Sequence, residues 1–341
     1  GVLYYTRHGK EFHVYTAESA PLAESGCRFC GACTEVCPTG AIQDKEGLIK
    51  GDNRKASLVP CKSTCPAEID VPRYVRFVKE GDYPAAAAVI REKVPFPWVL
   101  GYVCDHPCES ECRRGEISDP TSIRELKRFA AEHDDASLWR EKMTPKDSTE
   151  KRVAVIGSRP AGLTAAYYLR LQGHEVTIFE ELPEAGGMLR YGIPEYRLPR
   201  HVTLSEVHVI EEAGVEIRTG ARVESLDALF DEGYEGVVVA VGTHKGQKLR
   251  IPGANSAGVL VSTDFLRDVN LGEAVAVGRR VVVLGGGNVA FDCARAARRL
   301  GAEEVFMACL ECREEMPASD DEIREGEEGG IILRPAHTST R

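Results

Sequence analysis

Cysteine is the residue type whose spacing says most about the chemistry of this chain. Nine of its twelve cysteines lie between residues 27 and 112, in groups with C-x2-C and C-x3-C intervals. In a chain of 341 residues, such clustering predicts metal ligation in a reducing, cytoplasmic compartment rather than a set of disulfides. The nine candidate metal ligands are Cys27, Cys30, Cys33, Cys37, Cys61, Cys65, Cys104, Cys108 and Cys112.

The first four cysteines have the spacing of an iron–sulfur motif. In the run from Cys27 to Pro38, three thiolates can surround one face of a cubane cluster, and the fourth usually reaches a second cluster. A zinc knuckle is the alternative, but zinc sites favour two separated cysteine pairs. The run resembles the second motif of ferredoxin modules attached to hydrogenases and formate dehydrogenases. Those modules carry a first motif upstream, so we expect either a missing N-terminal segment or a fourth ligand from elsewhere in the chain.

Two glycine-rich turns, at residues 157–162 and 285–288, predict nucleotide-binding sites. Each follows an apolar run and precedes a helical pattern. A strand that ends at such a turn presents backbone N–H groups and the positive end of a helix dipole to a diphosphate. Glu180 ends the next apolar strand, at the place where an acidic residue binds a ribose hydroxyl in a dinucleotide fold. The sequence therefore predicts two α/β nucleotide-binding units.

The elements that must position these residues follow from hydrophobic periodicity. Residues 1–26 alternate around Gly9 and predict a small β-hairpin. Helical patterns cover residues 74–80, 83–92 and 123–133, the last with Ile123, Leu126, Phe129 and Ala130 on one face. Residues 134–151 are polar and aperiodic, which predicts a domain boundary. The spacing of Cys104, Cys108 and Cys112 fits either a helix face or a tight turn, and both bring three sulfurs together.

Residues 58–133 resemble the helical iron–sulfur domain of the glutamate synthase small subunit. The same domain occurs in dihydropyrimidine dehydrogenase and in electron-bifurcating NADH-dependent ferredoxin:NADP oxidoreductases. The matching motifs are Cys-x3-Cys-Pro-x2-Ile-Asp-Val-Pro and Val-Cys-x-His-Pro-Cys-Glu-x2-Cys-Arg-Arg-Gly. The resemblance implies one [4Fe–4S] cluster on Cys65, Cys104, Cys108 and Cys112. The family's second cluster needs two cysteines before Cys61 that this chain lacks, so Cys61 either completes the cluster of Cys27, Cys30 and Cys33 or remains from a lost cluster.

The same resemblance extends over residues 58–335 and assigns the first glycine turn to FAD. Residues 186–199 and 237–243 match the family's flavin-side loop and later strand. The family has Gly-x-Gly-Pro-Ala-Gly, whereas this chain has Arg159 where the middle glycine lets the backbone approach the pyrophosphate. A side chain there should crowd the pyrophosphate. Arg159 either swings out and pairs with a phosphate or is a sequence error, and we expect FAD to bind. The expected contacts in this part are Gly157, Pro160, Ala161, Gly162, Glu180, Gly187, Met188, Arg190, Arg197 and Thr243.

The second glycine turn is expected to bind a nicotinamide nucleotide. In NADPH-using relatives the strand end equivalent to Leu310-Glu311 usually carries two arginines. A carboxylate there accepts hydrogen bonds from both ribose hydroxyls and repels a 2′-phosphate, so Glu311 predicts NAD(H) over NADP(H). The alternatives are that Glu311 points to solvent and that Arg313 serves a phosphate. The expected contacts are Gly285, Gly287, Asn288, Val289 and Glu311.

These inferences predict an α/β fold with two Rossmann-like domains, for FAD and NAD(P), after a ferredoxin-like module and an α-helical iron–sulfur domain. The expected domains are residues 1–50, 51–150, 151–275 and 276–341, with the module and the last domain incomplete and the chain truncated at both ends. A net charge of −10 argues against nucleic-acid binding. No apolar stretch approaches the roughly 20 residues of a membrane helix.

The predicted function is that of an electron-transfer flavoprotein subunit. It would oxidise or reduce NAD(P)H through FAD and exchange electrons through [4Fe–4S] clusters with ferredoxin or with a partner such as a hydrogenase or formate dehydrogenase subunit. Bifurcating complexes are one setting for such a subunit. A glutamate synthase small subunit is the first alternative, against which the extra ferredoxin motif and Glu311 both argue. The second is a non-catalytic wiring or scaffold subunit with an empty flavin site.

Overall fold

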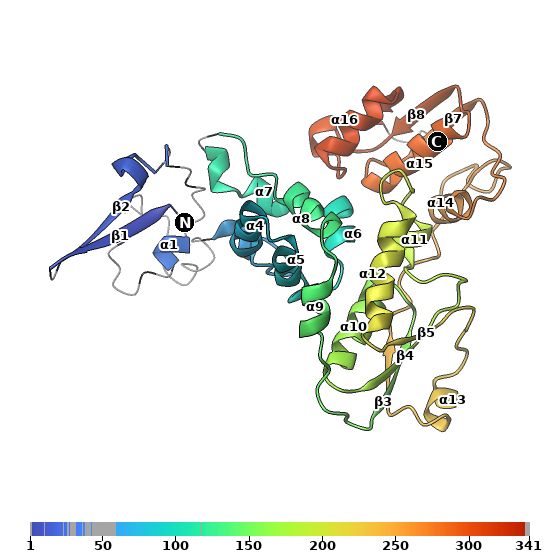
Figure 1. Cartoon of the computed structure of the whole chain (residues 1–341). Coiled ribbons are helices and arrows are strands. Elements are labelled where there is room, and N and C mark those ends of the chain that lie inside the picture. Colours follow the sequence, from blue (N-terminus) through green and yellow to red (C-terminus); the bar gives the residue numbers. More distant parts are fainter. Residues whose placement is uncertain are drawn as a thin grey trace. The chain divides into compact units, whose positions relative to one another are not determined.

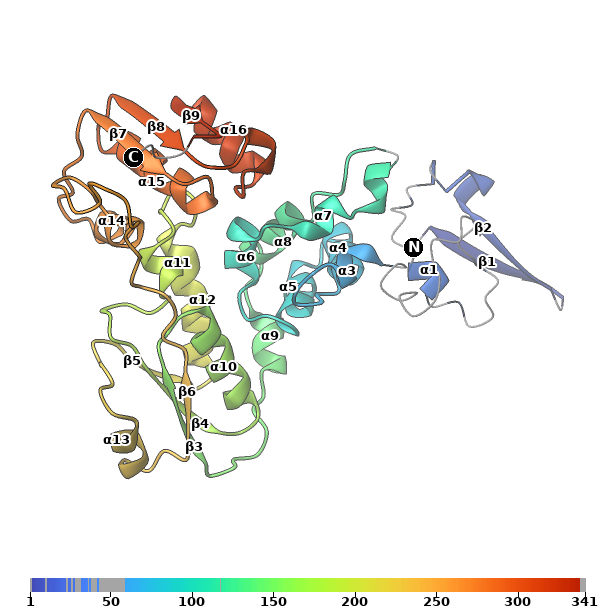
Figure 2. The ribbon, with the colours of Figure 1, turned by 180° about the vertical axis from the view of Figure 1, so that it is seen from behind.

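The structure is a computed structural model that describes residues 2–9, 11–22, 24–25, 27, 32–35, 37, 42, 59–116 and 118–337. It divides into two compact units, Gly1–Trp139 and Arg140–Arg341, and each is described by itself. Figures 1 and 2 show their helices and strands from opposite sides. Within the described residues, no helix has both the length and the apolar composition that a membrane span requires.

The first unit begins with a two-stranded antiparallel hairpin. Strand β1 (Leu3–His8) pairs with β2 (Glu11–Thr16) along its whole length. The turn between them contains Gly9, whose φ of +65° lies in the left-handed region that glycine adopts without steric cost. The expected hairpin is therefore confirmed. It is followed by the short helices η1 (Ala17–Ser19) and α1 (Ala32–Glu35).

Short helices make up the rest of the first unit. Asp70 and Asp82 begin two of them, because each aspartate side chain accepts a hydrogen bond from a backbone N–H three residues later. Gly81 ends the first of the two in the left-handed conformation. The expected helices are confirmed with small shifts of their ends. The bounds are α3 (Pro60–Ser63), α4 (Val71–Glu80), α5 (Tyr83–Arg91), α6 (Pro97–Val103), α7 (Pro107–Ser110), η3 (Arg113–Glu116), α8 (Ile123–Glu132) and α9 (Ser137–Lys142).

The core of this unit is built by close packing of α4, α5, α6 and α8. The four alanines of α5, residues 85–88, are at most 8% exposed. Gly101 of α6 lies against the backbone of α8, because a Cβ added at Gly101 would be 2.6 Å from Cα of Arg128. The expectation that Phe129 shares one face of α8 with Ile123 and Ala130 is wrong. Phe129 is 40% exposed and meets Tyr83 edge-on with 5.2 Å between ring centroids, because it lies off the face that Ile123 and Ala130 bury.

The second unit contains two parallel sheets. The first has the strand order β5-β4-β3-β6, in which β3 is central. Its strands are β3 (Arg152–Ile156), β4 (Glu175–Phe179), β5 (Glu216–Arg218) and β6 (Gly236–Val239). The helices between and after them are α10 (Pro160–Leu171), α11 (Met188–Tyr191), α12 (Arg200–Glu212), α13 (Leu226–Asp231) and α14 (Ser262–Asn270).

The strands of the second sheet follow one another in the same order as β3, β4 and β5 of the first sheet. Strands β7 (Arg280–Leu284), β8 (Glu304–Ala308) and β9 (Ile331–Arg334) are parallel and lie in that order. Helix α15 (Asn288–Arg299) follows the second glycine turn, and η4 (Arg313–Glu315) and α16 (Asp320–Glu328) precede β9. Phe291, Val305 and Met307 are almost fully buried in the core between α15 and the sheet. The predicted α/β fold with two strand–turn–helix–strand units is confirmed.

Candidate functional site

Four cysteines of the helical part lie near one buried tyrosine. Tyr74 on α4 is 1% exposed, and its hydroxyl donates a hydrogen bond to the carbonyl oxygen of Ile123 at 2.9 Å. Burial raises the pKa of Tyr74 well above its usual value, and four nearby thiols raise that pKa further. The fold thus brings sulfurs from three separate segments to one place. The four cysteines are Cys61, Cys65, Cys104 and Cys108.

Cys112 lies beside this group. It lines a small pocket together with Cys61 and Pro60 of α3. Cys104 follows α6, Cys108 lies within α7 and Cys112 follows α7, so the three cysteines lie before, within and after one short helix and not on one helix face. The structure therefore groups Cys61 with the cysteines of the helical part. Cys30 of the first motif lies outside the described residues, whereas Cys27, Cys33 and Cys37 lie within them.

The donor chemistry of this group fits an iron–sulfur cluster. Thiolates are soft ligands that favour iron–sulfur clusters or zinc. Burial raises the pKa of the Cys108 thiol to about 12, so a cation is needed to hold it as the thiolate. Within the described ranges, no three His, Cys, Asp or Glu side chains converge on a position for a metal ion. A cubane spreads its thiolates around four iron atoms, so it requires a wider arrangement than a single ion does.

The first glycine turn joins β3 to α10, as predicted. Gly157 has a φ of +100°, and a Cβ there would lie 2.6 Å from the carbonyl oxygen of Ala240. A Cβ on Gly162 would lie 2.0 Å from the carbonyl oxygen of Gly157. Both positions therefore require glycine, as a turn that approaches a diphosphate does. Pro160 and Ala161 form the first turn of α10.

Glu180 lies directly beside this turn and holds it in place. One of its carboxylate oxygens accepts hydrogen bonds from the backbone N–H and the hydroxyl of Ser158, at 2.8 and 2.5 Å. The other accepts from the backbone N–H of Leu182 at 2.9 Å. Glu180 is 2% exposed. The predicted ribose-binding carboxylate is thus at the turn, and it also has a structural role through Ser158 that the sequence did not indicate.

Arg159, the residue that departs from the family's glycine pattern, has its side chain between three loops. A Cβ added at Gly187 would lie 2.2 Å from Cγ of Arg159, and one at Gly242 would lie 2.3 Å from Cδ of Arg159. Among the described residues, the Nε of Arg159 is buried without a hydrogen-bond partner. The fold and the two other glycines of the turn fit a dinucleotide, and Arg159 is the exception.

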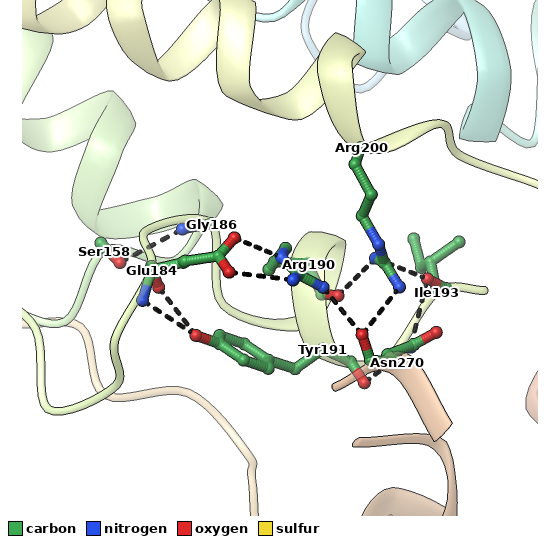
Figure 3. Close-up of polar contacts among 8 residues, drawn as sticks. All are labelled: Ser158, Glu184, Gly186, Arg190, Tyr191, Ile193, Arg200 and Asn270. Atoms are coloured by element: carbon green, nitrogen blue, oxygen red, sulfur yellow. Dashed lines mark hydrogen bonds and ion pairs between the residues drawn. The ribbon is translucent and has the colours of Figure 1, made fainter. Parts of the chain in front are cut away.

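The loop between β4 and α12 is held by a network of polar contacts (Figure 3). Arg190 of α11 donates to both carboxylate oxygens of Glu184, at 2.5 and 2.9 Å, and to the carbonyl oxygen of Asn270 at 3.1 Å. The amide of Asn270 donates to the carbonyl oxygens of Tyr191 and Ile193. The structure therefore places Arg190, a predicted cofactor contact, in the support of this loop. Met188 begins α11 in the same loop, and Thr243 is exposed next to Gly242.

The second glycine turn joins β7 to α15. Gly285 has a φ of +132°, and a Cβ on Gly286 would lie 3.4 Å from Oε2 of Glu311. The carboxylate of Glu311 therefore faces this turn. Arg313, the alternative phosphate ligand, donates to Oε2 of Glu327 at 2.5 Å. Gly287 and Val289 flank Asn288, whose side-chain oxygen accepts from the backbone N–H of Ser319 at 2.9 Å.

Arg197 links the flavin-side loop to the second sheet. It donates to Oδ2 of Asp292 on α15 at 2.7 Å and pairs with Glu322 of α16 at 2.8 Å. Asp292 is 3% exposed, and burial raises the pKa of its carboxyl to about 7, although Arg197 opposes the rise. The ring of Tyr196 stacks under the guanidinium of Arg299, 3.6 Å from the ring centroid. Arg197, predicted from the resemblance as a cofactor contact, thus joins two parts of the second unit.

Three family models match the chain, in the order of its parts. Residues 22–43 match the 4Fe-4S binding domain, and residues 53–139 match dihydropyrimidine dehydrogenase domain II with its 4Fe-4S cluster. Residues 151–329 match the pyridine nucleotide-disulphide oxidoreductases. The chain belongs to the pyridine nucleotide-disulphide oxidoreductase family. The predicted 4Fe-4S domains and the predicted oxidoreductase class are therefore confirmed.

The names of similar proteins include both coenzymes, NADP and NAD. The chain is 41% identical over 363 residues to the NADP(+)-dependent formate dehydrogenase subunit beta of Moorella thermoacetica, covering 93% of this chain and 51% of that protein. It is 35% identical over 286 residues to the glutamate synthase [NADPH] small chain of Halomonas elongata, covering 80% and 60%. It is 34% identical over 280 residues to the NAD-dependent dihydropyrimidine dehydrogenase subunit PreT of Escherichia coli, covering 80% and 67%. The resemblance predicted from the motifs is confirmed, and this chain spans between half and two thirds of these relatives.

Proposed function

We propose that this oxidoreductase exchanges electrons between a nicotinamide nucleotide and [4Fe–4S] clusters by way of FAD. The observation that carries the proposal is the pair of glycine turns, at Gly157 and Gly285, within one compact unit. Bound FAD would supply hydride acceptance and one-electron release, and bound clusters would carry single electrons. The chain's own residues bind and orient these groups, and no acid–base pair is needed.

The thiols divide into two proposed sets. Cys65, Cys104, Cys108 and Cys112 would hold one cluster. The support is that the first three lie near Tyr74 and that Cys112 lines an adjacent pocket. Cys61 lies with them and is a further candidate ligand. Cys27, Cys33 and Cys37 would serve a second cluster with Cys30, in the segment that matches the 4Fe-4S binding domain.

We further propose that NAD(H) is preferred over NADP(H). The carboxylate of Glu311 faces the second glycine turn, where it would accept hydrogen bonds from ribose hydroxyls and repel a 2′-phosphate. Arg313 is engaged by Glu327 and so is not poised to neutralise a phosphate. The names of the relatives include both coenzymes, so the proposal rests on these two residues alone.

The proposed partners are redox subunits of formate dehydrogenase or hydrogenase type, or ferredoxin, in the cytoplasm. The support is the relative from Moorella thermoacetica, which is a formate dehydrogenase subunit by name. A non-catalytic scaffold remains the second candidate, because Arg159 lies across the expected flavin site. Co-purification of the chain with its native complex would identify the partner.

Two measurements test the proposal. The visible spectrum of the purified chain is expected to show flavin and iron–sulfur absorption, and a protein without flavin bands would favour the scaffold. Stopped-flow reduction is expected to be faster with NADH than with NADPH, and the Glu311→Arg variant is expected to reverse that order. The Glu314→Arg variant is the matched control, because Glu314 is an exposed glutamate three residues away, in η4. Faster reduction of the unaltered protein by NADPH would refute the coenzyme preference.

A further inference from the structure

The side chain of Arg159 runs through a narrow channel, in which glycines leave the room that it occupies. Three glycines with positive φ line the channel: Gly157 at +100°, Gly187 at +57° and Gly242 at +58°. The atoms of Arg159 that a Cβ on each glycine would approach trace the course of the arginine side chain. The one at Gly187 would meet Cγ of Arg159, the one at Gly242 would meet Cδ and Nε, and the one at Gly157 would lie 3.1 Å from Nη1. The arginine therefore extends past all three glycines in turn.

The channel lies where the first turn would hold a diphosphate. Its three walls are the β3–α10 turn, the Gly186–Gly187 turn and the segment after β6. The middle glycine of a dinucleotide turn lets the backbone approach the pyrophosphate closely. In this chain that position is Arg159, and its own side chain fills the space that close approach would otherwise leave open.

Partial burial costs the guanidinium of Arg159 some of its hydration, and the charges of Glu180 and Glu181 offset part of that cost. Among the described residues the Nε of Arg159 has no hydrogen-bond partner, and burial lowers the pKa of its guanidinium. His244 follows β6, and its pKa is lowered first by burial and then by the charge of Arg159. The Nε2 of His244 is likewise buried without a partner in the described part of the chain. Two buried polar nitrogens at this place therefore have no hydrogen-bond partner among the described residues.

We propose that Arg159 and the diphosphate of FAD compete for this channel, so that Arg159 sets the affinity and the association rate of the flavin. The proposal rests on the proposed function, because it assumes that the first turn takes FAD. The guanidinium must leave the channel before the diphosphate can enter. Once outside, it loses the packing of its stem against Gly187 and Gly242, and this loss is subtracted from the binding free energy of FAD.

The test compares FAD binding to the apo-form of the full chain and of two variants. Arg159→Ala empties the channel, whereas Arg159→Lys keeps a long cationic stem in it. Binding is followed by the quenching of FAD fluorescence at equilibrium and in stopped flow. We expect Arg159→Ala to bind FAD faster and at least about tenfold tighter than the unaltered chain, and Arg159→Lys to remain within about threefold of it. Arg222→Ala, an exposed arginine of the same unit, controls for the loss of one positive charge.

Three outcomes would overturn the competition between Arg159 and FAD. Equal or weaker binding of FAD by Arg159→Ala, with an unchanged far-ultraviolet circular dichroism spectrum, would overturn the competition while leaving the flavin function intact. Tight binding by the unaltered chain, with weaker binding by both Arg159→Ala and Arg159→Lys, would show that the guanidinium pairs with the diphosphate, and would also overturn it. Absence of FAD binding to every variant would refute both the competition and the proposed flavin function.

Discussion

Arg197 in the loop before α12 donates a hydrogen bond to Asp292 on α15, with 2.7 Å between Nη1 and Oδ2. The two residues are 95 positions apart, and they connect the part of the unit that carries the first glycine turn to the part that carries the second. Arg197 also forms an ion pair with Glu322 of α16, and Glu322 forms a second ion pair with Arg295. Because these side chains are between 4% and 18% exposed, water screens their charges only weakly.

Removal of this arginine is expected to destabilise the second unit. The Arg197→Ala variant leaves Asp292 and Glu322 buried with less positive charge, and breaking a buried pair in this way costs about 3 kcal/mol. Urea denaturation at pH 8 measures the loss. Arg279→Ala is the control, because its pair with Glu303 is 82% and 56% exposed and should contribute less than about 1 kcal/mol. Equal losses in the two variants would contradict a structural role for the buried pair.

The pH dependence of stability is expected to carry the signature of Asp292. The pKa of Asp292 is about 7 in the folded chain, above its ordinary 3.8, mainly because of burial. The folded state therefore holds this proton more tightly, so stability declines as the pH rises from about 4 to 7, by up to about 1.4 kcal/mol per unit. The Asp292→Asn variant cannot titrate there. Denaturation at pH 5 and pH 8 should show the unaltered chain losing stability relative to Asp292→Asn, and a constant difference would exclude the shifted pKa.

Cys108 is expected to be needed for iron retention, whereas Cys61 is a fifth thiol beside the four proposed ligands of that cluster. Cys108→Ala should lower the iron content by about four atoms per chain, the content of one [4Fe–4S] cluster, and Cys61→Ala should leave it unchanged, although both side chains belong to one group of buried residues. Iron and acid-labile sulfide are measured on purified protein. Cys293→Ala is the matched control, because Cys293 is equally buried but lies in the second unit. The Cys61→Ala/Cys108→Ala double variant should lose no more iron than Cys108→Ala alone. A loss of iron in Cys61→Ala would make Cys61 a ligand, and a doubled loss in the double variant would assign it to a different cluster.

Close packing of α6 on α8 makes Gly101 sensitive to a single methyl group. Alanine favours a helix over glycine by about 1 kcal/mol. Here the added Cβ would lie 2.6 and 2.7 Å from Cα and Cβ of Arg128, so the helices must separate, at a cost of about 1 to 3 kcal/mol. We therefore expect Gly101→Ala to lower the unfolding midpoint. Gly278→Ala, whose nearest neighbour would be at an ordinary 3.5 Å, should leave it unchanged.

Local sequence patterns predicted those structural features that depend only on residues close together in the sequence. The glycine turns, the strands beside them and the capped helices all arise within a few residues, so their spacing indicated both sheets and the position of Glu180. The cysteine intervals likewise predicted the class of metal site. The finer domain limits at residues 50, 150 and 275 and the individual ligand assignments remain predictions.

Contacts between distant segments could not be predicted. Tyr74 meets Ile123 across 49 residues, and no periodicity indicates that a phenol lies among the thiols. Ser158 belongs to the first turn, but its bond to Glu180 requires β4 to lie beside β3. Arg159 was evident as a departure from the glycine pattern. Its course past Gly187 and Gly242 depends on how three loops meet, which the sequence does not encode locally.

The two sheets differ in one respect that affects how the purified chain should behave. Strand β3 has β4 on one side and β6 on the other, whereas its counterpart β7 pairs, within the described part of the chain, with β8 alone. Val282 and Leu284 of β7 are 62% and 52% exposed. A strand edge with unpaired backbone groups and exposed aliphatic side chains is a template for another strand. Concentrated solutions of this chain are therefore expected to form edge-to-edge dimers through β7, which dilution would dissociate.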